Sequence, residues 1–260
     1  MKRKAILVVS FGTSHNDTRQ KTIDKIEIDI QNEYPDYSIY RAFTSKMIID
    51  ILRNREGIHI STVTEAMEQM RQDGISEVIV QPTHILNGIE NDIMIKEVNL
   101  YKENFSSILF GAPLLSEVDD YWKVINAFVK RWGPLNKNEA IVCMGHGTEH
   151  YSNASYAALD YMFKSHGFDN IYVATVESYP SLEDIIDKLK ENKYSKIILI
   201  PFMIVAGDHV KNDMAGNEDD SWKVVLENEG FEVVCVLEGL GENSDIRRIF
   251  IEHINKVLNI

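Results

Sequence analysis

Cysteine and long apolar runs are scarce in this sequence of 260 residues. The two cysteines, Cys143 and Cys235, each lie in an apolar run, and no CxxC pair occurs. We therefore expect no disulfide framework and predict two buried thiols in a reducing compartment.

No apolar run approaches the roughly 18 residues of a membrane helix. The run after MKRK spans only Ala5 to Phe11, without a small-residue cleavage pattern behind it. This favours a first β-strand over a signal peptide and predicts a cytoplasmic protein.

Excess positive charge is also absent. Lys and Arg number 27 against 40 Asp and Glu, the formal net charge is −13, and basic clusters are short. Nucleic acids and anionic membrane surfaces are bound through concentrated positive charge, so we expect neither as a partner. The hydrophobic share of 44% and the charged share of 26% are ordinary for a globular protein with a sizeable core.

Three widespread catalytic and nucleotide-binding motifs are missing. The sequence has no GxSxG and no GxxxxGK[ST], and SFGTSH stands where a GxGxxG would follow the first apolar run. These absences argue against an α/β-hydrolase triad, a P-loop and a dinucleotide cofactor. We therefore expect no organic cofactor and a chemistry that depends on side chains.

Short apolar runs alternate with longer amphipathic segments along the chain. We predict helices over residues 17–34 and 118–132, and one that Ser61 caps and that continues through Met70. The predicted strands cover residues 5–11, 37–43, 77–82, 107–113, 139–145, 170–176, 196–202 and 231–237. Such alternation is typical of an α/β fold with parallel sheets covered by helices on both faces.

The two halves of the chain resemble each other. LVVSFGT (7–13) aligns with VCMGHGT (142–148), and EVIVQPTHILNGIEND (77–92) aligns with KIILIPFMIVAGDHVKND (196–213). We predict an N-terminal domain over 1–132 and a C-terminal domain over 139–260, whose last helix is free to pack back on the first domain. The fold class is then two similar doubly wound parallel-sheet domains facing each other across a cleft, with ligand beyond the carboxyl ends of the strands.

Three polar residues follow predicted strands of the second half. His146 follows the strand at 139–145, Glu177 follows the strand at 170–176, and His209 lies in the loop after 196–202. Parallel strands bring these loops to one edge of the sheet. Two imidazoles and a carboxylate are a suitable partial shell for a divalent transition metal. A turn role for His146 and a solvated surface position for Glu177 are the alternatives.

Other histidines fit this chemistry less well. His150 lies four residues after His146, as in the HExxH zinc motif. The flanking Gly145 and Gly147 disfavour a helix there, and glycine replaces the glutamate of that motif. His253 lies in the apolar stripe of the last predicted helix and is expected to be a packing residue.

Longer stretches of the chain resemble a known family. GHGT (145–148) together with PFMIVAGDHVKNDMAG (201–216) resembles the class II tetrapyrrole chelatases. VVSFGTS (8–14), PTHILNGIENDIM (82–94) and DHVKNDMAG (208–216) resemble in particular the anaerobic cobalt chelatases of cobalamin biosynthesis. The resemblance covers essentially the whole chain. It implies two similar chelatase-like α/β domains that enclose a macrocycle, and a lyase that inserts Co(II) into sirohydrochlorin without ATP.

The resemblance also implies roles for single residues. His146 and His209 would be catalytic and, with Glu177, would bind the metal. Glu90 would be a catalytic glutamate of the first domain, and Phe11 stands where the aligned half has His146. The residues expected to bind substrate are Ser10, Phe11, Thr13, Ser14, His84 and Gly145. Four cations near strand ends are available for substrate carboxylates, although each also fits a solvated surface charge: Arg41, Lys46, Lys96 and Lys211.

Metal insertion must remove two pyrrole protons, and a neutral imidazole can accept such a proton near neutral pH. The expected metal substrate is Co²⁺ and the expected partner is a small-molecule tetrapyrrole. A homo-oligomer is compatible with the sequence. Two alternatives stay open, namely a chelatase for Fe(II) in the sirohaem branch or for Ni(II), and a non-catalytic tetrapyrrole or metal carrier.

Overall fold

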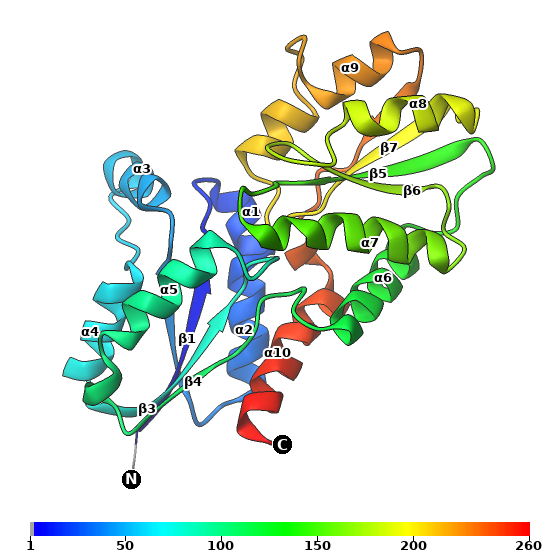
Figure 1. Ribbon diagram of the computed structural model, residues 1–260. Helices are drawn as coiled ribbons and strands as arrows, with labels where there is room; N and C mark the ends of the chain where they lie inside the picture. Colours follow the sequence, from blue (N-terminus) through cyan, green and yellow to red (C-terminus); the bar gives the residue numbers. More distant parts are fainter. Residues whose placement is uncertain (1–2) are drawn as a thin grey trace. The chain divides into compact units, whose positions relative to one another are not determined.

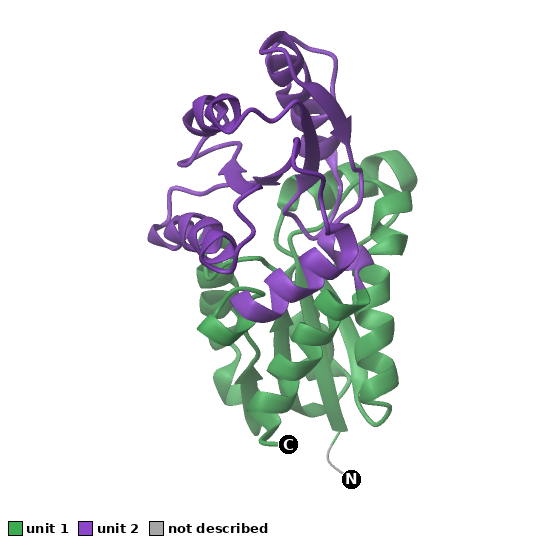
Figure 2. Ribbon diagram, turned by 90° about the vertical axis from the view of Figure 1, so that its right-hand side faces the viewer, with its two compact units in different colours: residues 1–120, 244–260 green, residues 121–243 purple. Residues whose placement is uncertain are grey.

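A computed structural model describes residues 3–260, and they form two compact units (Figure 2). Unit 1 comprises the chain up to Asp120 together with Ser244–Ile260, and unit 2 comprises Tyr121–Asn243. Each unit has a four-stranded parallel sheet with helices on both faces (Figure 1). The predicted fold class of two similar α/β domains is therefore confirmed, while their arrangement around a cleft stays a prediction.

The sheet of unit 1 has the strand order β2-β1-β3-β4. Its strands are β1 (Arg3–Ser10), β2 (Ser38–Phe43), β3 (Ile75–Pro82) and β4 (Ser107–Phe110). Its helices are α1 (Asn16–Lys21), α2 (Ile23–Glu33), α3 (Lys46–Glu56), α4 (Val63–Gln72), α5 (Ile89–Asn99), the 3₁₀ turn η1 (Lys102–Asn104) and α10 (Ser244–Leu258). Alternate residues of β1 point to opposite faces, so Leu7 packs with α4 and α5 residues while Val8 is buried on the other face.

The sheet of unit 2 repeats this arrangement in the order β6-β5-β7-β8. Its strands are β5 (Glu139–Gly145), β6 (Ile171–Thr175), β7 (Lys196–Pro201) and β8 (Glu232–Cys235). Its helices are α7 (Ala154–Ser165), α8 (Glu183–Glu191), α9 (Trp222–Asn228), the 3₁₀ turns η2 (Tyr151–Asn153) and η4 (Leu240–Glu242), and a π-helical turn, η3 (Val210–Met214). α8 and α9 cover one face, and α7 with the later part of α6 (Val118–Trp132) covers the other (Figure 1).

The unit boundaries differ from the predicted domain limits. They fall inside α6, after Asp120, and before α10, which belongs to unit 1. α10 packs against α2, β3 and β4 through its apolar stripe. Polar bonds add to this packing, because Arg247 Nε donates to Asp29 Oδ2 at 2.6 Å and Tyr34 Oη donates to Asn255 Oδ1 at 2.7 Å. The strand pattern cannot reveal these long-range contacts.

Three local details also differ from the sequence-based expectation. The predicted helix over 17–34 is broken at Thr22, whose hydroxyl donates to the Thr18 carbonyl oxygen at 2.6 Å. α4 is capped by Thr62, whose capping box with Glu65 makes it a better N-cap than the preceding serine. Cys143 is fully buried, but Cys235 on the edge strand β8 is only half-buried. No helix within residues 3–260 is long and apolar enough to cross a membrane.

Candidate metal centre

His146, Glu177 and His209 converge in unit 2. Each offers one ligand atom, and these atoms all lie within 4.8 Å of one another. His146 Nδ1 lies 3.5 Å from Glu177 Oε2, and the rings of His146 and His209 meet edge to face with centroids 4.7 Å apart. Their side chains are 41%, 52% and 39% exposed, respectively. The three donors are therefore close enough for one ion and open enough for an exchangeable metal to reach them.

The loops that carry His146 and Glu177 continue the β5–β6 pairing past the strand ends. The Val176 amide donates to the Gly145 carbonyl oxygen at 3.0 Å, and the Glu177 amide donates to the His146 carbonyl oxygen at 2.9 Å. The backbone thus sets the two residues side by side before any metal arrives. Gly147 then reverses the chain with a φ of +88°, a conformation that favours glycine.

Asn153 joins the same two loops through its side-chain amide. Its Oδ1 accepts from the Thr148 amide at 3.1 Å, and its Nδ2 donates to the Tyr179 carbonyl oxygen at 2.6 Å. Thr148 lies two residues after His146, and Tyr179 lies two residues after Glu177. One side chain therefore holds both ligand loops. Sequence reasoning missed Asn153, because its two partners are brought together only by the fold.

A buried tyrosine explains the glycine before His146. An ideal Cβ on Gly145 would lie 2.5 Å from the Tyr156 ring, so only glycine fits there without movement. Burial raises the pKa of Tyr156 to about 12 against the opposing effect of hydrogen bonds from the Gly147 and His146 backbone. The phenol therefore stays neutral, and its ring packs against the loop that carries His146. Gly145 has a packing role in unit 2, and its contact with substrate stays a prediction.

His209 has a carboxylate partner of its own. Its Nδ1 lies 2.5 Å from Asp213 Oδ2. The turn that carries this pair is anchored by Val210 and Met214, which are both fully buried. Sequence reasoning missed Asp213, although its spacing of four residues from His209 in a helical segment was a usable signal.

Unit 1 has the same hydrogen bonds between its strand-end loops, but it lacks the imidazole and carboxylate side chains. The Thr44 amide donates to the Ser10 carbonyl oxygen at 2.9 Å, and the Ser45 amide donates to the Phe11 carbonyl oxygen at 3.2 Å. These are the counterparts of the bonds made by Val176 and Glu177 in unit 2. Phe11 thus occupies the place of His146, as the internal alignment predicts, and Ser45 occupies the place of Glu177. This position in unit 1 cannot supply the imidazole and carboxylate of the metal centre.

The predicted hydroxyl ligands of substrate are buried in unit 1. The Thr83 hydroxyl donates to Ser10 Oγ at 2.8 Å, and the His15 amide donates to Thr13 Oγ1 at 3.2 Å. Ser14 is also buried, and its carbonyl oxygen accepts from the Arg55 guanidinium. The hydroxyls of Ser10 and Thr13 and the carbonyl oxygen of Ser14 are therefore engaged inside unit 1. Phe11, in contrast, is exposed, and the contact of all four residues with substrate stays a prediction.

His84 and Glu90 follow β3. Both imidazole nitrogens of His84 are buried and lack a hydrogen-bond partner among residues 3–260. Burial lowers the pKa of His84 to about 4, so the ring is neutral at physiological pH. Glu90 lies in the first turn of α5 and is half-buried. Their predicted roles, substrate binding for His84 and catalysis for Glu90, stay predictions.

The predicted cations differ in availability. Arg41 Nε donates to Glu27 Oε1 at 2.7 Å, and its Nη2 also bonds Glu27 and Asp24. Arg41 is thus held in an ion-pair cluster with α2 rather than free for a ligand. Lys46 and Lys96 are exposed, while Lys211 is half-buried on the turn after His209.

Apolar side chains gather at the carboxyl edge of the unit 1 sheet. Phe11 follows β1, Met47 lies in the first turn of α3, and Ile89 and Ile93 lie in the first two turns of α5; all four are exposed.

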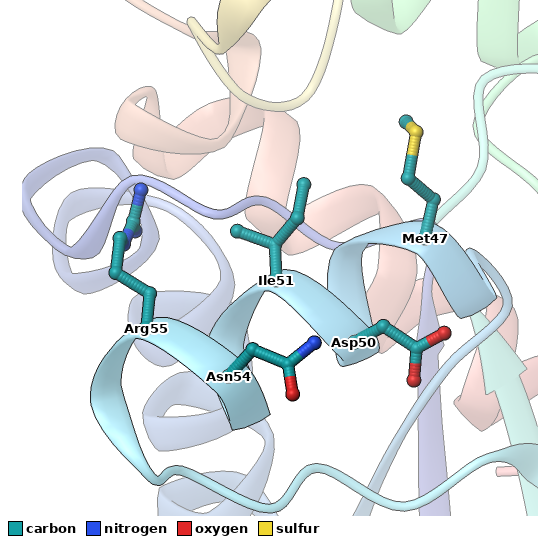
Figure 3. A pocket seen from close by; sticks show the side chains of 5 residues that line it. All are labelled: Met47, Asp50, Ile51, Asn54 and Arg55. Carbon is teal, nitrogen blue, oxygen red and sulfur yellow. The ribbon is translucent and has the colours of Figure 1, made fainter.

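A shallow groove of about 710 Å³ runs along α3, where Met47, Ile51 and Arg55 rise from the same side of the helix (Figure 3). Asp50 and Asn54 complete its lining. The groove has one carboxylate and no imidazole, so it is not a second metal centre.

The fold with two parallel sheets is shared with solved structures. SirB from Bacillus subtilis, solved with Fe³⁺, shares the fold with a TM-score of 0.66, covering 99% of this chain and 96% of that chain at 13% identity. The chain belongs to the cobalt chelatase (CbiK) family, whose model matches residues 4–259.

Two curated relatives agree with this assignment. Sirohydrochlorin cobaltochelatase of Salmonella typhimurium is 42% identical over 258 residues, covering 99% of this chain and 97% of the relative. Sirohydrochlorin cobaltochelatase CbiKC of Nitratidesulfovibrio vulgaris is 28% identical over 265 residues, covering 100% and 92%.

Proposed function

We propose that this protein is a lyase that inserts Co(II) into sirohydrochlorin without ATP. The observation that carries the proposal is the cluster of His146, Glu177 and His209, whose ligand atoms lie within 4.8 Å of one another in a chain of the cobalt chelatase family. The curated relatives, matched over nearly their whole length, are sirohydrochlorin cobaltochelatases.

In the proposed mechanism, His146, Glu177 and His209 hold the incoming Co(II). Imidazole nitrogens suit this borderline metal, and the Glu177 carboxylate offsets part of its charge. The side chains are partly exposed, which lets the ion arrive from solvent and leave again. A fully enclosed site would bind the ion without releasing it.

The same histidines accept the pyrrole protons. As two metal–nitrogen bonds form, two N–H bonds of the macrocycle break, and each proton needs a base. A neutral imidazole has a nitrogen lone pair that can accept such a proton. Release of cobalt to the ring frees the imidazole lone pairs for this step. Ligand exchange and proton transfer therefore use the same atoms in succession.

We assign substrate binding in unit 1 to the carboxyl edge of its sheet. The exposed side chains there, Phe11, Met47, Ile89 and Ile93, offer apolar surface to a flat conjugated ring. Glu90 in the first turn of α5 is a further base at this edge. Lys46, the first residue of α3, is an exposed cation at this edge that suits the substrate's carboxylates, whereas the exposed Lys96 lies in the last turn of α5, away from it.

The test is anaerobic mixing of the protein with sirohydrochlorin and Co(II), followed by absorbance. We expect the spectrum of the cobalt macrocycle to appear at a rate proportional to enzyme concentration, and His209→Ala to reduce that rate by about 10²-fold or more. His59→Ala is the matched control, because His59 is an exposed histidine of unit 1. Binding of sirohydrochlorin with no change of spectrum after cobalt addition would identify a carrier instead.

The same assay decides the metal. Residue types alone do not separate Co(II) from Fe(II) or Ni(II), because affinity order and metal supply govern the choice. We expect Co(II) to be inserted fastest when the three ions are compared at equal concentration. Faster insertion of Fe(II) would assign the protein to sirohaem synthesis.

A further inference from the structure

We propose that Asp213 is a positioning residue that holds His209 in the tautomer needed for metal binding. The inference rests on the function proposed for His209. It concerns a residue that touches neither the metal nor the substrate in the scheme above and acts only through the imidazole.

The short distance between the two side chains indicates which nitrogen of His209 carries the hydrogen. His209 Nδ1 lies 2.5 Å from Asp213 Oδ2. An ionised carboxylate oxygen can only accept a hydrogen bond, so His209 Nδ1 must carry a hydrogen. A neutral imidazole has one N–H, and the lone pair is therefore on Nε2. Asp213 thereby selects the nitrogen that is available to Co(II).

The local backbone explains why this pair forms. The Ala215 amide donates to the Val210 carbonyl oxygen at 3.1 Å, which is the five-residue spacing of a π-helical turn. Val210 and Met214 are buried in the unit 2 core and turn the preceding residues, His209 and Asp213, toward the open side. Such turns occur frequently at functional sites.

Gly216 makes the turn possible. An ideal Cβ at this position would lie 2.1 Å from the Asn212 carbonyl oxygen, so any other residue would force the turn to change. The Gly216 amide donates to that same oxygen at 3.0 Å. The segment is therefore built to hold one conformation, and Asp213 is placed by backbone geometry rather than by chance surface pairing.

The other histidine is oriented in a different way. His146 Nδ1 lies 2.9 Å from the Gly147 carbonyl oxygen, which is also only an acceptor. Both histidines thus have the lone pair on Nε2. The tautomer of His146 is set by a backbone carbonyl oxygen, and the tautomer of His209 is set by the Asp213 side chain. Of the two, only the His209 tautomer can be changed by replacing its hydrogen-bond partner. Outer partners of this kind typically contribute about 10- to 100-fold in metal affinity.

The experiment uses the full-length protein with Asp213→Ala, Asp213→Asn and Asp213→Glu. Anaerobic titration with Co(II) alone, followed by the visible bands of bound Co(II), reports affinity. Long-range ¹H–¹⁵N NMR of the metal-free protein reports which nitrogen of His209 carries the proton. Asp219→Asn is the matched control, because it removes an exposed carboxylate from the segment that follows.

We expect Asp213→Ala and Asp213→Asn to weaken Co(II) binding by about 10- to 100-fold, with the His209 proton moving to Nε2. The asparagine amide can donate to Nδ1, so it favours the wrong tautomer while keeping the shape of aspartate. Asp213→Glu should recover part of the affinity, and Asp219→Asn should behave as wild type. Circular dichroism and thermal unfolding check that each variant is folded.

The positioning role is overturned if folded Asp213→Ala and Asp213→Asn proteins bind Co(II) as tightly as wild type and keep the proton on Nδ1. Failure of the proposed function gives a different result. A wild-type protein whose Co(II) affinity depends on Asp213, yet which inserts no cobalt into sirohydrochlorin, would refute the chelatase activity and still support the positioning role.

Discussion

Phe11 holds in unit 1 the backbone position that His146 holds in unit 2. The amide of Ser45 donates to the Phe11 carbonyl oxygen at 3.2 Å, and the amide of Glu177 donates to the His146 carbonyl oxygen at 2.9 Å. Two copies of one fold therefore carry an aromatic ring and a hydroxyl in one case, and an imidazole and a carboxylate in the other. Phe11, which is exposed, suits contact with a flat ring, whereas the Ser45 hydroxyl is buried and caps α3. The second pair suits a metal ion.

Exchanging the side chains of Phe11 and His146 tests whether only unit 2 binds the metal. We expect His146→Phe to lose Co(II) binding, because one of three ligands is removed. Phe11→His should not create a second site, since its neighbour in the place of Glu177 is Ser45, a poor metal ligand. The measurement is an anaerobic Co(II) titration with the stoichiometry read at saturation. Two bound ions in Phe11→His would show that unit 1 is also able to hold the metal.

In the proposed metal centre, Glu177 supplies the negative charge. Glu177→Gln keeps the size of the side chain but removes its charge and its preference for metal coordination. We expect Co(II) affinity to fall by at least about tenfold, which corresponds to about 1.4 kcal/mol. Glu149→Gln is the control, because Glu149 is an exposed glutamate of the same loop region. Equal losses in the two variants would indicate a general charge effect instead of coordination.

Asn153 couples the His146 loop to the Glu177 loop. Asn153→Ala removes two hydrogen bonds, and at about 0.5–1.5 kcal/mol each we expect a loss of unfolding free energy of about 1–3 kcal/mol. Asn153→Asp separates the two bonds, because a carboxylate can still accept from the Thr148 amide but cannot donate to the Tyr179 carbonyl oxygen. Urea unfolding and initial rates of cobalt insertion should rank the proteins wild type, Asp, then Ala if the Thr148 bond contributes. An alanine variant as stable and as active as wild type would contradict the coupling.

A buried histidine–carboxylate contact links α10 to the start of α6. His253 Nε2 lies 3.0 Å from Asp120 Oδ1, and the side chains are only 3% and 1% exposed. His253 Nδ1 lies 2.9 Å from the Ala112 carbonyl oxygen. Burial raises the pKa of Asp120, but the hydrogen bond and charge of His253 and the amides of Glu117 and Ser116 outweigh it and hold the pKa below 3.8.

This pair predicts the acid stability of unit 1. A depressed carboxyl pKa stabilises the fold above the ordinary pKa, and this contribution is lost as pH falls through the folded-state value. Asp120→Asn should therefore cost about 1.5–3 kcal/mol near neutral pH, because it removes the carboxylate that the buried His253 ring and the Ser116 and Glu117 amides contact. The difference from wild type should shrink as the pH falls through the folded-state pKa of Asp120.

Urea unfolding across this pH range measures the effect. Glu117→Gln serves as the control, because it removes an exposed ion pair with Lys256 of α10 and leaves the Asp120 carboxylate and the backbone amide that bonds it in place. A stability difference between Asp120→Asn and wild type that does not change with pH would rule out the linkage.

The sequence alone predicted the fold class and the grouping of the three residues of the candidate metal centre. Apolar runs separated by amphipathic segments indicate parallel strands and covering helices, because burial of both sheet faces demands that pattern. His146, Glu177 and His209 could be grouped from sequence since each follows a strand, and parallel strands end at one edge. The internal alignment also predicted that Phe11 is the counterpart of His146 in the first half of the chain.

Tertiary structure decided what surrounds these residues. Asp213 contacts His209, Asn153 bonds the loops that carry His146 and Glu177, and the Tyr156 ring packs against Gly145. Hydrophobic periodicity does not encode such contacts. Arg41 pairs with α2, and the hydroxyls of Ser10 and Thr13 are used inside unit 1. The last helix packs on unit 1 because its apolar stripe fits α2, β3 and β4, far earlier in the chain. Periodicity records which residues must be buried, but only packing determines which of them meet.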